Sequence, residues 1–273
     1  MTSEPLVSIV TVTYNAGKYI EQTMRSVFAQ SYCNIEYIII DGGSTDETVR
    51  MIKDQGLKVN IFVSEPDMGI YDAMNKGIRL CRGELIGIIN ASDYYESGAV
   101  ENVVRAYNDD PAAGIFHGNI NMLNPDGSFF KTKKPVEDPA CLTEGMSLFH
   151  PTFFVRRKVY DNQGLYSTDL KLAADFDFAL RCFLAGVKFH YIDMALSNFR
   201  KGGVSSVRDI DSLLESRDAL LMNGFSREVA NSVHRRLDKL RKRNIRYETV
   251  YYMLGKILSK RILNFLSRRF SIR

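Results

Sequence analysis

The chain has 273 residues, 45% of them hydrophobic, which is enough for one large domain with a core and excludes wholesale disorder. Its four cysteines lie far apart without CxxC or metal-finger spacing, so we expect reduced thiols in a cytoplasmic protein. We expect neither a secretory signal nor a membrane-spanning helix, because no apolar run approaches the roughly 18 residues that cross a bilayer.

The net charge of +4 is distributed unevenly along the chain. Residues 227–273 contain 14 Lys and Arg against 3 Asp and Glu, a charge of +11, whereas the preceding 226 residues contain 22 against 29, a charge of −7. This asymmetry predicts an acidic body and a basic segment that meets an anionic partner.

The first half alternates between short apolar runs and stretches whose apolar residues recur at helical spacing. The predicted strands are Val7–Thr13, Ile35–Ile40, Val59–Val63 and Leu85–Ile89. The predicted helices are one containing Ile20, Met24, Val27 and Phe28, one with a capping box of Ser44 and Glu47, and one over Ile70–Cys81. Because each strand is apolar throughout, we expect a parallel sheet covered by helices on both faces.

The second half is less regular. The predicted elements are a turn at Asn124–Gly127, a strand at Phe153–Val155, a helix at Ala173–Ala185, a strand at Val187–Ile192, a basic loop at Arg200–Gly203 and helix from Arg208 onward.

Polar side chains gather where the predicted strands end. Tyr14, Asp41, Ser64 and Asn90–Asp93 each follow a strand. Ligands of parallel sheets bind beyond the carboxyl ends of the strands, so we expect these segments to share one cleft. The carboxylates, amide and amine of Ser64–Gly77, with Asp93, suit a phosphate-bearing ligand held through a divalent metal.

These segments, together with Thr11-Val12-Thr13-Tyr14-Asn15, resemble the family 2 glycosyltransferases, which are inverting sugar-transfer enzymes of the GT-A fold. The resemblance covers roughly residues 5–206. It implies an α/β fold, a Rossmann-like and mostly parallel sheet flanked by helices. We expect a catalytic domain over 1–206, with a nucleotide-sugar half at about 1–95 and an acceptor half at about 96–206, followed by a basic helical extension over 207–273.

The resemblance assigns the metal site to the end of the fourth predicted strand. Relatives carry Asn-Ser-Asp-Asp, and this chain has Asn90-Ala91-Ser92-Asp93, so Ser92 replaces the first Asp and Asp93 is retained. Asp93 is therefore the expected ligand of Mg²⁺ or Mn²⁺, with a helix cap as the alternative.

Donor-binding roles follow for several further residues. The resemblance implies that Asp41 contacts the nucleotide base and that Tyr14 stacks on it, with an Asx-turn and plain packing as the alternatives. Asp67 would bind ribose or sugar hydroxyls. The remaining expected donor-binding residues are Thr11, Asn75, Lys76 and Ser92. Met68 and Met74 stand where relatives carry basic residues, so the metal, with Arg200, Lys201 or Arg208, would offset the diphosphate charge.

Asp175 is the expected catalytic base, since it matches the aspartate of relatives that deprotonates the acceptor hydroxyl. The string Asp175-Phe176-Asp177 is not read as a metal motif, because residues i and i+2 of a helix point about 200° apart. We expect Asp177 to cap the helix or be solvated. A salt bridge of Asp175 to Arg181 or Lys171 is the alternative.

Three further residues are expected around the acceptor. His150 lies in a segment that resembles the family's acceptor region, and the alternative is a purely structural role. Arg200 and Lys201 begin a segment that resembles a loop that closes over the site in family members, and the alternative is a plain surface turn.

The predicted reaction is inverting transfer of a sugar from a nucleoside-diphosphate sugar, with UDP the expected nucleotide, to a hydroxyl acceptor in surface polysaccharide or glycolipid synthesis. A non-catalytic nucleotide-sugar-binding or assembly subunit and a sugar nucleotidyltransferase are the rivals. The expected acceptor is a saccharide or a lipid-linked one. We expect no nucleic-acid partner. The C-terminal helices are expected to meet an anionic membrane on its inner face, with packing on the domain or on a second copy in a homodimer as the alternative.

Overall fold

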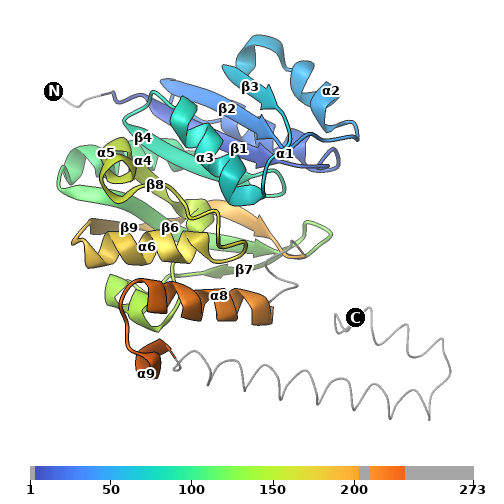
Figure 1. The fold of residues 1–273 in the computed structure, drawn as a ribbon. Coiled ribbons are helices and arrows are strands. Elements are labelled where there is room, and N and C mark those ends of the chain that lie inside the picture. The colour runs from blue at the N-terminus through green and yellow to red at the C-terminus, as the bar shows by residue number, and fades with distance from the viewer. Residues whose placement is uncertain (1–3, 203–208, 231–273) are drawn as a thin grey trace, which may run out of the picture.

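The computed structural model describes residues 4–202 and 209–230 (Figure 1). Its strands are β1 (Val7–Thr13), β2 (Ile35–Asp41), β3 (Ile61–Ser64), β4 (Leu85–Asn90), β5 (Tyr94–Tyr95), β6 (Ala113–Leu123), β7 (Phe129–Lys133), β8 (Phe154–Arg156) and β9 (Lys188–Arg200). Its α-helices are α1 (Ile20–Phe28), α2 (Thr48–Lys53), α3 (Ile70–Leu80), α4 (Ala99–Asp109), α5 (Arg157–Gln163), α6 (Ala174–Leu184), α8 (Asp209–Met222) and α9 (Arg227–Ala230). Three short 3₁₀ turns are η1 (Gly56–Lys58), η2 (Pro139–Glu144) and η3 (His150–Thr152).

The strands form one sheet in the order β3-β2-β1-β4-β8-β6-β9-β5, with β7 paired to β6. The first four strands are parallel, and the register places Thr13 beside Asp41 and Asp41 beside Ser64. Since β8 is antiparallel to both β4 and β6, and β9 is parallel to β6, the ends of β6 and β9 lie at the same edge as the ends of β1–β4. We call this edge the carboxyl edge. The expected mostly parallel sheet is confirmed.

The sheet is buried on both faces, which explains why its strands are apolar without alternation. Ile38 and Ile40 of β2 pack in one core cluster with Met74 of α3, whereas Ile39 packs in the other with Met24 of α1. Helices α3, α5 and α6 cover the first face, and α1 and α4 cover the second.

Several predicted details are corrected. Ser44 does not cap α2: its hydroxyl donates to Asp41 and accepts from the Asn15 N–H, and Asp46 instead accepts from the Thr48 N–H at 3.0 Å. The strand expected at Val187–Ile192 continues to Arg200 as β9, because it pairs with the whole of β6.

The expected boundary near residue 206 stays a prediction. Helix α8 begins after residue 206, yet Ala219 and Leu220 are buried in the same core cluster as α6. The first part of the expected extension is therefore packed on the body. The basic helices expected over residues 231–273 lie outside the described residues. None of the helices that the structure describes is long and apolar enough to cross a membrane.

Candidate active site

Asp41 fixes the loop that follows β2. Its carboxylate is fully buried and accepts hydrogen bonds from the Gly43 N–H at 3.2 Å, the Ser44 N–H at 2.9 Å, the Ser64 hydroxyl at 2.7 Å and the Ser44 hydroxyl. The Asx-turn that the sequence left open is thus present, and it joins the ends of β2 and β3. Contact between Asp41 and a nucleotide base stays a prediction.

Tyr14 and Asp67 meet at Gly42. A Cβ atom on Gly42 would lie 3.4 Å from the Tyr14 ring and would collide with the Asp67 carboxylate. Tyr14 is 64% exposed, so its ring is free to stack on a ligand. Asp67 Oδ1 accepts from the Gly69 N–H at 2.8 Å. The structure therefore brings Tyr14, Asp41 and Asp67, three predicted donor residues, to one place at the carboxyl edge.

Thr11 and Asn75 are not part of this site. Thr11 is fully buried, and its hydroxyl lies 2.9 Å from that of Tyr37 in the core. The Asn75 amide donates to the Tyr166 carbonyl at 2.8 Å and accepts from the Tyr166 N–H at 3.0 Å. Both side chains hold the fold together, which corrects their expected donor-binding roles.

Lys76 is already engaged. Its ammonium lies 2.9 Å from the Glu65 carboxylate and 3.6 Å from that of Asp72, and it donates to the Pro66 carbonyl at 2.9 Å. Lys76 therefore holds the loop before α3 against the helix. Its contact with donor phosphates stays a prediction.

Asp93 is 1% exposed and follows β4. Its Oδ1 accepts from the Arg200 backbone N–H at 3.0 Å. Burial raises the pKa of the Asp93 carboxyl to about 7, and the Arg200 N–H and charge offset only part of that rise. Nearby in sequence, the buried Asn90 Oδ1 has no hydrogen-bond partner in the described part of the chain, and Ser92 is partly exposed. Underused hard oxygens at this strand end fit a divalent cation.

The side chains of Arg200 and Lys201, which were expected near the donor, contact other residues. The Arg200 guanidinium donates to the Gln22 side chain at 2.9 Å and lies 5.1 Å from the centre of the Tyr19 ring. The Lys201 ammonium lies 3.2 Å from the centre of the Phe130 ring. Neither cation faces Asp41 or Asp67 through a contact in the structure. The remainder of the expected closing loop, including Arg208, lies outside the described residues.

Asp175 stands in the first turn of α6 and is joined to α3. Its Oδ1 accepts from the Tyr71 hydroxyl at 3.1 Å and from the Phe176 N–H at 2.9 Å. Burial, followed by the Asp175 charge, raises the pKa of Tyr71 well above its usual value, so Tyr71 stays a protonated donor. The alternative salt bridge of Asp175 to Arg181 is wrong, since Arg181 pairs with Asp177.

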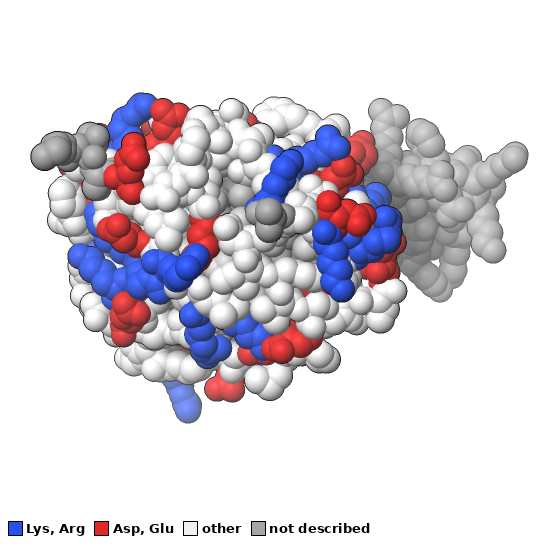
Figure 2. Space-filling model, turned by 90° about the horizontal axis from the view of Figure 1, so that it is seen from above, with Lys and Arg blue, Asp and Glu red and all other residues white. Residues whose placement is uncertain are grey.

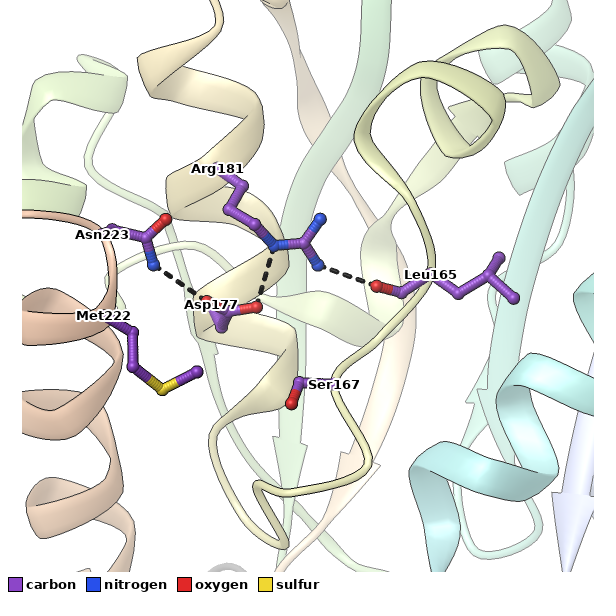
Figure 3. A pocket seen from close by; sticks show the side chains of 6 residues that line it. All are labelled: Leu165, Ser167, Asp177, Arg181, Met222 and Asn223. Carbon is purple, nitrogen blue, oxygen red and sulfur yellow. Dashed lines mark hydrogen bonds and ion pairs between the residues drawn. The ribbon is translucent and has the colours of Figure 1, made fainter.

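Asp177 points away from Asp175, as the helical spacing predicts. Its Oδ2 lies 2.9 Å from the Arg181 guanidinium and its Oδ1 accepts from the Asn223 amide at 2.9 Å. It is 3% exposed, so the expectation that it caps the helix or is solvated is wrong. With Met222 and others it lines a pocket of about 260 Å³ between α6 and α8, which contains no predicted site residue (Figure 3).

A cluster of buried aromatic side chains packs against Tyr71, the hydrogen-bond partner of Asp175. The Tyr71 and Tyr166 ring centres are 5.8 Å apart, and the Tyr166 hydroxyl lies 2.9 Å from His150 Nε2. Burial lowers the pKa of His150, and the nearby Asp175 charge opposes that shift. His150 is thus buried and is linked to the predicted base through Tyr166 and Tyr71.

Sequence reasoning missed two residues that position Asp175. Tyr71 lies in the Ser64–Gly77 segment without an assigned role. Glu215 of α8 accepts from the backbone N–H groups of Lys171, Leu172 and Ala173 at 2.8, 2.7 and 3.1 Å. This carboxylate anchors the chain just before α6 and places a negative charge near the N-terminus of that helix. No local pattern links Glu215 to a segment more than 40 residues earlier.

Comparison with known proteins places this geometry in a family. The model described as Glycosyl transferase family 2 matches residues 8–164, more than half of the chain. A chondroitin synthase of Escherichia coli is 27% identical over 228 residues, which cover 82% of this chain and 33% of that protein. A PGL/p-HBAD biosynthesis glycosyltransferase of Mycobacterium bovis is 26% identical over 211 residues, which cover 74% of this chain and 80% of that protein. The chain thus spans about a third of the chondroitin synthase.

Two solved structures share the fold at 18% identity. TarS of S. aureus (residues 1–349) in complex with UDP-GlcNAc matches with a TM-score of 0.63 over 83% of this chain and 70% of that one. The mannosyltransferase PcManGT of Pyrobaculum calidifontis, in complex with GDP-Man and Mn²⁺, matches with a TM-score of 0.63 over 85% of this chain and 69% of that one. With this GT-A architecture and a family model that matches more than half of its residues, the chain belongs to glycosyl transferase family 2.

Proposed function

We propose that the protein transfers a sugar from a UDP-sugar to a hydroxyl acceptor with inversion at the anomeric carbon. The observation that carries this proposal is the hydrogen bond between Tyr71 and Asp175. It joins the helix that follows the donor-side loop of Asp67 to the carboxylate that serves as base. The donor-side loop and the base are thereby linked by a direct hydrogen bond between α3 and α6, and such linkage is what positioned catalysis needs.

Tyr14 and Asp67 bind the nucleoside portion of the donor, with the loop that Asp41 organises beneath them. The Tyr14 ring stacks on the base, and Asp67, held beside Gly42, accepts from ribose hydroxyls. Ser92 lies next to the diphosphate. The TarS complex with UDP-GlcNAc supports uracil as the base, while the PcManGT complex with GDP-Man makes guanine the alternative to test.

Asp93 would hold Mg²⁺ or Mn²⁺, and the Asn90 Oδ1 from the same strand end, unpartnered among the described residues, is a further oxygen that could serve as a ligand. The raised pKa of the Asp93 carboxyl and the unpartnered Asn90 Oδ1 are what a cation would relieve. When bound, the cation neutralises the charge of the leaving diphosphate. The described residues contain no cluster of three His, Cys, Asp or Glu side chains, so the donor and water would supply the remaining ligands.

Asp175 takes the proton of the acceptor hydroxyl as that oxygen bonds to the anomeric carbon and the bond to the diphosphate breaks. Its Oδ1 already accepts two hydrogen bonds, which leaves Oδ2 to receive the proton. Attack and departure on opposite faces of the ring give inversion. The acceptor is a saccharide or a lipid-linked hydroxyl, and the similarity to a chondroitin synthase and to a PGL/p-HBAD biosynthesis glycosyltransferase supports that class.

The test has two parts. Thermal shift with UDP- and GDP-sugars, with and without Mn²⁺, identifies the donor, and release of the nucleoside diphosphate with an acceptor panel shows transfer. Pyrophosphate as the product would instead indicate a sugar nucleotidyltransferase. Donor binding without any release across the panel would favour a non-catalytic binding subunit.

A further inference from the structure

The hairpin of β6 and β7 carries an exposed surface that the reaction does not use. All five residues of β7 are exposed, and among them Phe129 is 63% and Phe130 49% exposed. Lys131 and Lys133 come from the same strand, and Lys201 lies over the Phe130 ring. We give the name aromatic–lysine hairpin to the set of Phe129, Phe130, Lys131, Lys133 and Lys201.

The three charged members of the aromatic–lysine hairpin are all lysines. Lys131, Lys133 and Lys201 form no ion pair within the described ranges, whereas the neighbouring Lys134 is paired with Asp193 at 2.8 Å. The positive charges of Lys131 and Lys133 add to burial in lowering the pKa of Lys201, so the three ammonium groups are close in space. The acid at the hairpin turn, Asp126, is engaged by Ser128.

Other parts of the surface differ. On the face that Figure 2 shows, blue and red side chains are interspersed around a largely uncharged centre. Lysines on an unpaired strand edge also guard against aggregation, and β7 pairs only with β6 among the described strands. That function explains the lysines but not two exposed phenylalanines, which themselves promote association.

The hairpin projects at the carboxyl edge, on which the proposed donor site lies. The strand β6 ends at Leu123 on this edge, and the Lys201 N–H donates to the Leu123 carbonyl at 3.1 Å. Lys201 follows Arg200, whose N–H is bonded to Asp93. Figure 1 shows the turn of the hairpin extending beyond the sheet on the side of the β1 and β2 ends.

We infer that the aromatic–lysine hairpin docks on an anionic lipid bilayer and presents the active-site edge to it. Phenylalanine side chains without hydrogen-bonding groups enter the headgroup boundary, and the unpaired lysines meet anionic lipid phosphates. This inference concerns a described segment of the body and does not depend on the basic residues 231–273. It also does not depend on the identity of the donor.

The absence of tryptophan from the chain provides the assay. In the full-length protein, Phe129→Trp introduces a single fluorophore on the hairpin. Leu80→Trp, at an exposed position at the end of α3 near the opposite edge of the sheet, is the matched control. With phosphatidylglycerol–phosphatidylcholine vesicles, we expect the Phe129→Trp emission to shift to the blue and to be quenched by brominated lipid. The Leu80→Trp emission stays unchanged.

Charge removal gives the second measurement. The double variant Lys131→Gln with Lys133→Gln should weaken partitioning onto these vesicles by roughly 10- to 30-fold, at about 1 kcal/mol per lysine. The control variant Lys53→Gln with Lys58→Gln removes two exposed charges distant from the hairpin. It should change the partitioning onto these vesicles less than twofold.

Three outcomes would overturn the inference. One is vesicle binding with Phe129→Trp unquenched, which would assign the contact to another segment. Another is no vesicle binding at all. The third is a response of Phe129→Trp to heparin but not to vesicles, which would make the hairpin a site for an acidic saccharide.

Discussion

The two aspartates of α6 offer a sharp test, because one substitution should remove activity and the other stability. Asp175→Asn keeps an oxygen that accepts from Tyr71 and from the Phe176 N–H, so the fold is retained while the base is lost. General-base catalysis contributes about 10²–10⁴-fold, so turnover should fall by that factor, or about 3–5 kcal/mol in the barrier.

For Asp177→Asn we expect the opposite result, a loss of stability rather than of turnover. It removes the charge that pairs with Arg181 at a site where Asp177 is 3% exposed. Breaking a buried pair costs about 3–5 kcal/mol. The Arg181 side chain is 23% exposed and keeps its bonds to the Gln163 and Leu165 carbonyls, so we expect a loss of about 1–3 kcal/mol.

Turnover is measured as nucleoside diphosphate release, stability by urea unfolding, and donor binding by titration with UDP and Mn²⁺. Both variants should bind UDP like the wild type. Wild-type turnover by Asp175→Asn, or a folded Asp177→Asn protein without turnover, would show that the base has been assigned to the wrong carboxylate.

Three further predictions concern other parts of the structure. Glu215→Ala removes the acceptor of three N–H groups before α6, which should cost about 1–2 kcal/mol in urea unfolding and lower turnover, whereas Asp218→Ala on the same helix should change either little. Gly42→Ala displaces Asp67, so UDP affinity measured by titration should fall at least about tenfold (about 1.4 kcal/mol) with little change in melting temperature; unchanged affinity would remove Asp67 from the donor site. His117 is buried with both ring nitrogens unpartnered within the described residues, and burial lowers its pKa from 6.5 to about 4. Between those values the unfolded chain binds more protons, so stability falls as the pH is lowered, and His117→Phe should gain about 2 kcal/mol over the wild type at pH 5 in thermal unfolding; a gap that does not grow below pH 6.5 would contradict this.

Local patterns in the sequence determined the sheet and the direction of key side chains. Strands apolar at every position, such as Ile35–Ile40, must be covered on both faces, which predicts the parallel sheet that is observed. Parallel strands share a carboxyl edge, so Tyr14, Asp41 and Ser64 could be expected to converge, and the Ser64 hydroxyl indeed donates to Asp41. The rotation of about 100° per residue likewise predicts that Asp175 and Asp177 point in different directions.

Only the tertiary structure decided what each polar group contacts. Thr11 and Asn75 have the residue types of donor ligands, yet their partners are Tyr37 and the Tyr166 backbone, 26 and 91 residues away. Glu215 supports the base helix from a position 42 to 44 residues further along the chain. A hydrogen bond depends on distance and angle in space, and packing sets these among elements whose order in the sheet differs from their order in the chain.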